Sequence, residues 1–128
     1  MENFNLFVGS GCLLIVILAL NVSRLRYKER IAHGFGDSKK LRNAIVAHSN
    51  ALEHLIPFAL ILYVLAAQNT SQTLVQGLAI SFLVLRLIHA LGVTQFVFRA
   101  WQISSALSYA LTLFSSCLIL YNWFHITV

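Results

Sequence analysis

The sequence predicts an all-α membrane protein, organised as a four-transmembrane-helix bundle in a single domain (residues 1–128). Of its 128 residues, 59% are hydrophobic and 10% are charged, and the mean hydropathy is +0.78. Soluble domains are about 45–50% apolar and about 25% charged. The chain also contains four long apolar runs, and a helix needs about 20 apolar residues to cross a bilayer. Four such spans take up most of the chain, so only short links remain between them.

The first apolar run predicts a span over residues 4–22, and its small residues Gly9, Ser10 and Gly11 permit close helix approach. The second run predicts a span over residues 41–67. Either Asp37 or Ser38 is expected to cap its first turn, because both side chains accept hydrogen bonds from free helical N–H groups. Pro57 lacks an N–H, so a kink or a local opening is expected beside it.

The third and fourth runs predict spans over residues 73–93 and 100–123. The third carries Arg86 and His89 near its end, spaced so that both lie on one face. The fourth closes with Tyr121 and Trp123, aromatic residues of the kind that anchor a helix at a membrane interface.

Positive charge is concentrated in the link between the first two spans, residues 23–40. Residues 23–42 hold most of the nine basic residues, namely Arg24, Arg26, Lys28, Arg30, Lys39, Lys40 and Arg42. Basic residues accumulate in cytoplasmic loops, where they meet anionic lipid. We therefore expect the basic link on the cytoplasmic side and both termini on the non-cytoplasmic side. Few aromatic residues are available there to stack on bases, so nucleic acid binding is not expected.

A stripe of polar residues runs along the second span. Asn50, Glu53, His54 and Pro57 follow the spacing i, i+3, i+4 and i+7 and share one helix face, and Asn43 extends this face toward the helix start. A charged residue in the middle of a bilayer costs about 2.5–3.5 kcal/mol. The stripe is therefore expected to form part of a binding site or to hold helices together.

Polar residues from two other parts of the sequence are expected to lie at the same depth in the bilayer as this stripe. Arg86 and His89 return to the same half of the bilayer, and Arg99 stands where the fourth span begins. Glu53 is the only carboxylate in an expected span, so we expect it to pair with Arg86 or Arg99. The two arginines also suit an anionic ligand, whether carboxylate, phosphate or thiolate. For Asn50, a bond between helices and a contact to a ligand remain equally open.

The histidines and cysteines do not indicate a metal site. His48, His54 and His89 lack the spacing that places two ligands on one side of a helix. Cys12 and Cys117 are isolated within expected spans, where they are expected to pack as small apolar side chains.

Three motifs together resemble one known family. Arg30 precedes HGFGD in the basic link, AHSNALEHLIPF carries the polar stripe, and RLIHALG contains Arg86 and His89. In these motifs the chain resembles the MAPEG family, the membrane-associated proteins of eicosanoid and glutathione metabolism, and in particular its short bacterial-type members. The resemblance covers about residues 24–102.

The resemblance implies a homotrimer that binds glutathione, as a co-substrate, between protomers. A lipophilic small molecule would enter from the lipid bilayer and be conjugated to glutathione or reduced by it, so the implied activity is that of a glutathione transferase or peroxidase. Arg99 matches by position an arginine that steadies the glutathione thiolate in the family's enzymes. The resemblance assigns Arg30, Asn50 and Glu53 to glutathione binding, and we expect His48, Arg86 and His89 to contribute to the same binding site.

The sequence also departs from the family pattern. Val46 stands where many members have an arginine, Val93 stands where many have a tyrosine, and Tyr109 is the first tyrosine after Arg99. Some family members bind lipid and catalyse nothing. A non-catalytic lipid-binding or scaffold protein of the same fold is therefore the first alternative to an enzyme. The second is a small proton-coupled transporter that uses Glu53.

Overall fold

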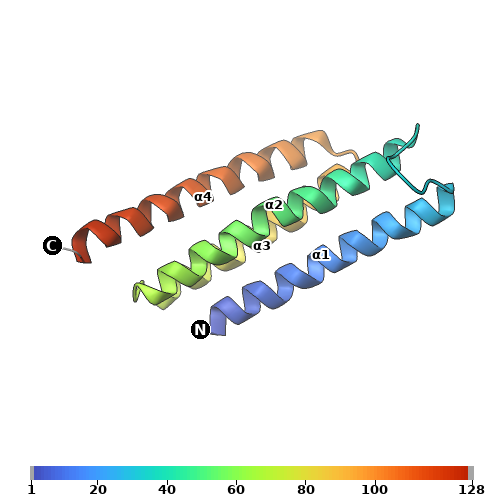
Figure 1. The fold of residues 1–128 in the computed structure, drawn as a ribbon. Helices are drawn as coiled ribbons and strands as arrows, with labels where there is room; N and C mark the ends of the chain where they lie inside the picture. The colour runs from blue at the N-terminus through green and yellow to red at the C-terminus, as the bar shows by residue number, and fades with distance from the viewer. Residues whose placement is uncertain (1, 127–128) are drawn as a thin grey trace.

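The computed structural model describes residues 2–126 and consists there of four long helices (Figure 1). Their bounds are α1 Glu2–Glu29, α2 Lys39–Ala67, α3 Gln72–Thr94 and α4 Phe98–Ile126. Each is long and apolar enough to cross a membrane, which confirms the predicted four-span, all-α fold. The α1–α2 and α3–α4 links lie at one end of the bundle, and the start of α1 and the end of α4 lie at the other (Figure 1).

Helix α1 is longer than the sequence predicted. It continues through RLRYKE, whose side chains are compatible with a helix, and so extends beyond residue 22, where the first span is expected to end. Arg30 then ends the helix in a left-handed conformation, with φ of 55°. The Ile31 N–H reaches back to the Arg26 carbonyl over 3.1 Å, as in the common helix-terminating motifs. The basic link is consequently shorter than residues 23–40.

Helix α2 begins at the cap that the sequence suggested. The Leu41 N–H donates to the Ser38 hydroxyl oxygen over 3.1 Å, which confirms Ser38 as the capping residue. The helix then runs without interruption through Pro57 to Ala67, so no break in the helix accompanies the proline.

An aromatic cluster joins α1, α2 and α3 in the core. Phe58 and Phe82 stack with ring centroids 3.7 Å apart and an interplanar angle of 4°. Phe7 of α1 lies against both, with centroids at 5.8 Å and 6.2 Å. Helix α3 contacts each of the other helices, whereas α1 and α4 do not meet within the described part of the chain. Figure 1 shows them on opposite sides of α2 and α3.

Polar side chains fasten the end of the bundle away from the basic link. The Asn122 amide donates to the side-chain oxygens of Gln68 and Thr70, each over 3.2 Å. The Gln68 amide donates in turn to the Ile119 carbonyl over 3.3 Å. These bonds hold the α2–α3 link against the last turns of α4.

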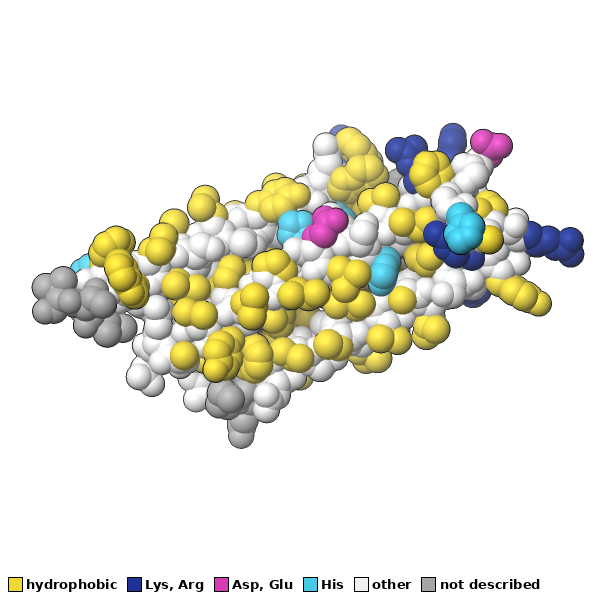
Figure 2. Space-filling view, viewed as in Figure 1, with side chains coloured by type: hydrophobic (Ala, Val, Ile, Leu, Met, Phe, Trp, Pro, Cys, Tyr) yellow, Lys and Arg dark blue, Asp and Glu magenta, His cyan; other side chains and the backbone are white. Residues whose placement is uncertain are grey.

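The outer surface of the bundle is suited to lipid. Figure 2 shows hydrophobic side chains over most of one face, with lysine and arginine gathered at the end that carries the α1–α2 link. Cys12 and Cys117 are unbonded and lie on the outer surface of the protomer. Apolar flanks and one basic end are the distribution expected of a bundle that spans a bilayer.

Candidate functional site

A pocket of about 550 Å³ lies between α2, α3 and α4, toward the end of the bundle that carries the basic link. It is lined by Lys39, Arg42, Asn43, Val46, Asn50, His89, Val93, Phe96, Trp101, Ser105 and Tyr109. On α4, the lining residues Trp101, Ser105 and Tyr109 recur every fourth position and so form a single face. The first turns of α2, the last turns of α3 and the first turns of α4 thus enclose one space.

The entrance of this pocket is cationic. Lys39 and Arg42 come from the first turn of α2, and the Arg42 guanidinium lies 5.6 Å from the centroid of the Phe35 ring in the basic link. Among the lining residues there is no aspartate or glutamate. The pocket therefore favours an anionic ligand, because two cations at its mouth face no competing carboxylate.

Two asparagines of α2 line the pocket at different depths. The Asn43 amide nitrogen donates to the Val93 carbonyl of α3 over 2.8 Å. The Asn50 side-chain oxygen accepts from Arg86 over 2.9 Å. Tyr109 adds a hydroxyl from α4, and its ring lies 5.3 Å from that of His54. Amides and hydroxyls arranged in this way are suited to the peptide groups of a ligand.

Arg86 lies behind the pocket wall. Its side chain is only 2% exposed, and it donates to Asn50 and, over 2.6 Å, to the Ser108 hydroxyl. The Ser104 carbonyl lies at 3.5 Å from the same guanidinium, while Nε has no partner within the described residues. His89, one turn later, is also buried and lines the pocket directly. Arg86 and His89 are thus both buried, as expected of residues three positions apart that share one helix face.

The expected ion pair of Glu53 is not formed within the protomer. Arg86 binds Asn50 and Ser108 instead, and Glu53 makes no hydrogen bond or ion pair with any other described residue. Three positions after Asn50, it is turned about 60° around the helix. Its side chain lies on the exposed surface of α2.

Arg99 and His48 do not line the pocket either. Arg99 precedes Trp101 by two positions, so it lies about 200° around α4 from the lining face and is exposed. The same rotation separates His48 from Val46 and Asn50 on α2. The expectation that Arg99 joins the other polar residues is therefore not met within one protomer.

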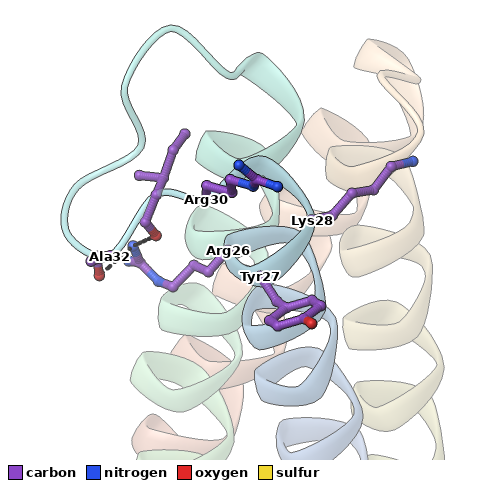
Figure 3. A pocket seen from close by; sticks show the side chains of 6 residues that line it. Arg26, Tyr27, Lys28, Arg30 and Ala32 are labelled. Atoms are coloured by element: carbon purple, nitrogen blue, oxygen red, sulfur yellow. Dashed lines mark hydrogen bonds between the residues drawn. The ribbon is translucent and has the colours of Figure 1, made fainter.

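Arg30 belongs to a separate surface hollow at the end of α1. Figure 3 shows Arg26 turned toward the backbone of the link, whereas Arg30 and Lys28 point elsewhere. Arg26 donates to the carbonyls of Ile31, Ala32 and Gly34, over 3.5, 3.2 and 2.8 Å. Its guanidinium is thus engaged in holding the link.

The sequence reasoning missed several lining residues, above all Lys39, Arg42, Trp101, Ser105 and Tyr109. Tyr109 is the first tyrosine after Arg99 and lies ten positions beyond it. The informative signal was the four-residue spacing from Trp101, which places both aromatic side chains on one side of α4. Val46 and Val93, the two departures from the family pattern, also line the pocket.

Comparison with known proteins identifies relatives of this chain. The model of the MAPEG family matches residues 4–125. Inner membrane protein YecN of Escherichia coli K12 is 35% identical over 98 residues, covering 76% of this chain and 73% of the relative. YecN of Escherichia coli O6:H1 matches to the same extent. With four apolar helices of spanning length, these findings support an integral inner membrane location. A match over nearly the whole chain shows that the protein belongs to the MAPEG family.

Proposed function

We propose that the chain binds glutathione in the pocket between α2, α3 and α4 and delivers its sulfur to lipophilic substrates. The observation that carries the proposal is the charge of the pocket, in which Lys39 and Arg42 stand at the mouth and no acidic residue lines the walls. Glutathione is a peptide with two carboxylates, so it matches a cationic mouth. The volume of about 550 Å³ falls within the range of about 300–1,000 Å³ usual for small-molecule sites.

The pocket groups suit different parts of the tripeptide. Lys39 and Arg42 would pair with a carboxylate, and the amides of Asn43 and Asn50 would meet peptide N–H and C=O groups. In conjugation the sulfur would form a bond to an electrophilic carbon and displace its leaving group. In reduction of a hydroperoxide, two glutathione molecules would give their disulfide, an alcohol and water.

We propose further that the protein assembles as a homotrimer, with each site completed across a protomer boundary. Glu53 and Arg99 are exposed on the single protomer. Charges that face hydrocarbon are costly, so a neighbouring protomer that covers them would lower the free energy. Because Arg99 faces away from the pocket of its own protomer, it would reach a glutathione sulfur only in a neighbour. A cation beside the sulfur favours the reactive thiolate.

The proposed orientation places the basic link and the pocket mouth on the cytoplasmic side and both termini on the opposite side. Glutathione would then enter from the cytosol, while a lipophilic substrate would arrive through the lipid around the helices. The basic end of the molecule supports this orientation, because cytoplasmic loops carry the excess of lysine and arginine.

One observation supports a second candidate, a member of the family that binds lipid without chemistry. Val46 and Val93 present apolar side chains to the pocket where many family members carry an arginine and a tyrosine. With these two valines the pocket offers fewer polar contacts to a tripeptide and a more apolar wall. Such a wall would suit the acyl chain of a lipid. This candidate predicts that the pocket binds lipid and leaves a bound thiol unreactive.

Glutathione titration of the purified protein in detergent, followed by calorimetry and by the ultraviolet absorbance of the thiolate, tests the proposal. Arg42→Gln should weaken binding about tenfold, because it removes a charge-assisted contact. Lys40→Gln removes a charge from the same turn that does not line the pocket and should bind like the parent. Arg99→Ala should abolish the thiolate signal. Failure of the parent to bind glutathione would refute the proposal, and binding without thiolate would favour the second candidate.

A further inference from the structure

The buried contact between Arg86 and Asn50 fixes which way the Asn50 amide faces. Arg86 approaches the Asn50 side-chain oxygen with a guanidinium nitrogen over 2.9 Å. A guanidinium donates hydrogen bonds and cannot accept them, so only the oxygen of the amide can face it. The orientation of this asparagine is therefore dictated by the chemistry of its partner.

The amide nitrogen of Asn50 is left free for the pocket. It donates to no other side chain or carbonyl within residues 2–126, although Asn50 lines the pocket. Its two N–H groups are thus available as donors on the wall. Arg86 cannot easily turn away, because it is 2% exposed and is held from α4 by the Ser108 hydroxyl at 2.6 Å.

Asn43 lies two helical turns closer to the mouth and is less constrained than Asn50. Its amide nitrogen donates one of its two N–H groups to the Val93 carbonyl over 2.8 Å, which leaves the side-chain oxygen and the second N–H group for a ligand. Helix α2 therefore offers both kinds of group at Asn43, beside the cationic mouth, and a donor at Asn50, deeper in the bilayer. At the inner position a ligand oxygen would match the N–H groups of Asn50, whereas Asn43 can either donate or accept.

We propose that Arg86 is a positioning residue that holds Asn50 as a hydrogen-bond donor, so that the inner end of the pocket selects an oxygen acceptor of the ligand. The inference rests on the proposed function, since it concerns the ligand of the same pocket. Arg86 itself does not line the pocket and acts through Asn50. For glutathione, the acceptor would be a carboxylate or a peptide carbonyl.

Asn50→Asp separates this role from a structural one. The carboxylate keeps an oxygen toward Arg86, so the thermal stability of the protein in detergent should be retained, while Asn50→Leu should lower it. The aspartate also replaces the donor with a negatively charged acceptor. Glutathione binding by Asn50→Asp should therefore weaken about tenfold or more. If Asn50→Asp binds glutathione as tightly as the parent, the inference is overturned.

Two substitutions of Arg86 provide an independent test. Lysine also donates without accepting, so Arg86→Lys should keep the Asn50 amide oriented and largely retain the affinity for glutathione. Arg86→Met should lose it. Equal affinity of these two variants, or equal loss in both, would contradict a positioning role. Ser115→Ala is the matched control, since this buried serine of α4 does not line the pocket.

The same experiments distinguish failure of the proposed glutathione binding from failure of the positioning role of Arg86. If the parent itself does not bind glutathione, that proposal falls, and the stability measurements still decide the orientation of the amide. Retained stability in Asn50→Asp together with loss in Asn50→Leu would show that the oxygen faces Arg86. Equal destabilisation of both variants would show that it does not.

Discussion

Gly92 of α3 lies against the backbone of Trp101 on α4 so closely that no side chain fits between them. A Cβ atom at Gly92 would stand 2.8 Å from the Trp101 amide nitrogen and 3.2 Å from its Cα. Small residues allow membrane helices to approach in this way. Because Val93 and Trp101 both line the pocket, this contact lies beside the pocket on its α3–α4 side.

Gly92→Ala should therefore separate α3 from α4 at this point. The obstructing atoms belong to the backbone, which yields less readily than a side chain, so we expect a loss of about 1–3 kcal/mol in the free energy of unfolding. Thermal unfolding in detergent measures the effect. Gly77→Ala is the control, because its Cβ would meet nothing within 4 Å. Equal stability of the two variants would contradict the close contact.

Phe82→Ala should weaken the junction of α1, α2 and α3. The substitution removes the ring that stacks on Phe58 at 3.7 Å and also contacts Phe7. In a soluble core such a change costs about 3–5 kcal/mol. Lipid supplies no hydrophobic drive between helices, so we expect a smaller loss of about 1–3 kcal/mol, measured by chemical or thermal unfolding. Phe114→Ala, on the outer surface, should change little.

Arg26→Ala should loosen the link between α1 and α2. Three backbone carbonyls, those of Ile31, Ala32 and Gly34, would lose their donor. Amide hydrogen exchange in the link should become faster and cleavage there by protease should increase, while the spans stay protected. Lys28→Ala removes an equal charge that makes no such bond to the link. Matching exchange rates in the two variants would show that charge alone, and not the clamp, orders this segment.

Ser38→Ala should destabilise α2 at its start by about 1 kcal/mol, since the Leu41 N–H loses its side-chain acceptor. Ser71 provides a built-in comparison, because it caps α3 without a side-chain hydrogen bond. Ser71→Ala should leave the unfolding temperature nearly unchanged. A larger effect at Ser71 than at Ser38 would contradict this assignment of the cap.

Glu53→Leu should stabilise an isolated protomer and alter its association. In an isolated protomer the exposed Glu53 would face hydrocarbon, and its removal would relieve a cost of about 2.5–3.5 kcal/mol. If a neighbouring protomer satisfies Glu53, as proposed, the same change should shift the assembly toward smaller species. Cross-linking and native mass spectrometry in detergent would measure the shift. Glu29→Leu, at the end of α1, should not change the assembly.

The sequence predicted the helices well because their signal is local. Four apolar runs define four spans, and the serine at position 38 identifies the start of α2. The extension of α1 beyond the expected span was not predicted, because RLRYKE combines interfacial charge with good helix formers. Charge composition suggested a link at that point, whereas helix propensity and the left-handed Arg30 decided where the helix ends.

The site was predicted less completely because it depends on helix rotation and on neighbours. Arg86 and His89 lie inward as their spacing indicated, but the partner of Arg86 is Asn50 and not Glu53. Asn50 and Glu53 are three positions apart on α2, so their side chains point in directions that differ by about 60° around the helix axis. That difference decides which of them can reach Arg86. The distance along the sequence between Arg99 and Tyr109 likewise concealed that the tyrosine, and not the arginine, faces the pocket.

The contacts of Arg86 also bear on how the chain enters the membrane. Synthesis proceeds from the N-terminus, so Asn50 is already in place when α3 emerges, whereas Ser108 has not yet been made. Arg86 would therefore pass through the insertion machinery when Asn50 is already available to bind it and Ser108 has not yet been synthesised. Insertion of α3 and α4 as a pair avoids leaving that guanidinium half-satisfied in lipid. The two helices would then form one unit of biogenesis, joined by the short link that follows Thr94.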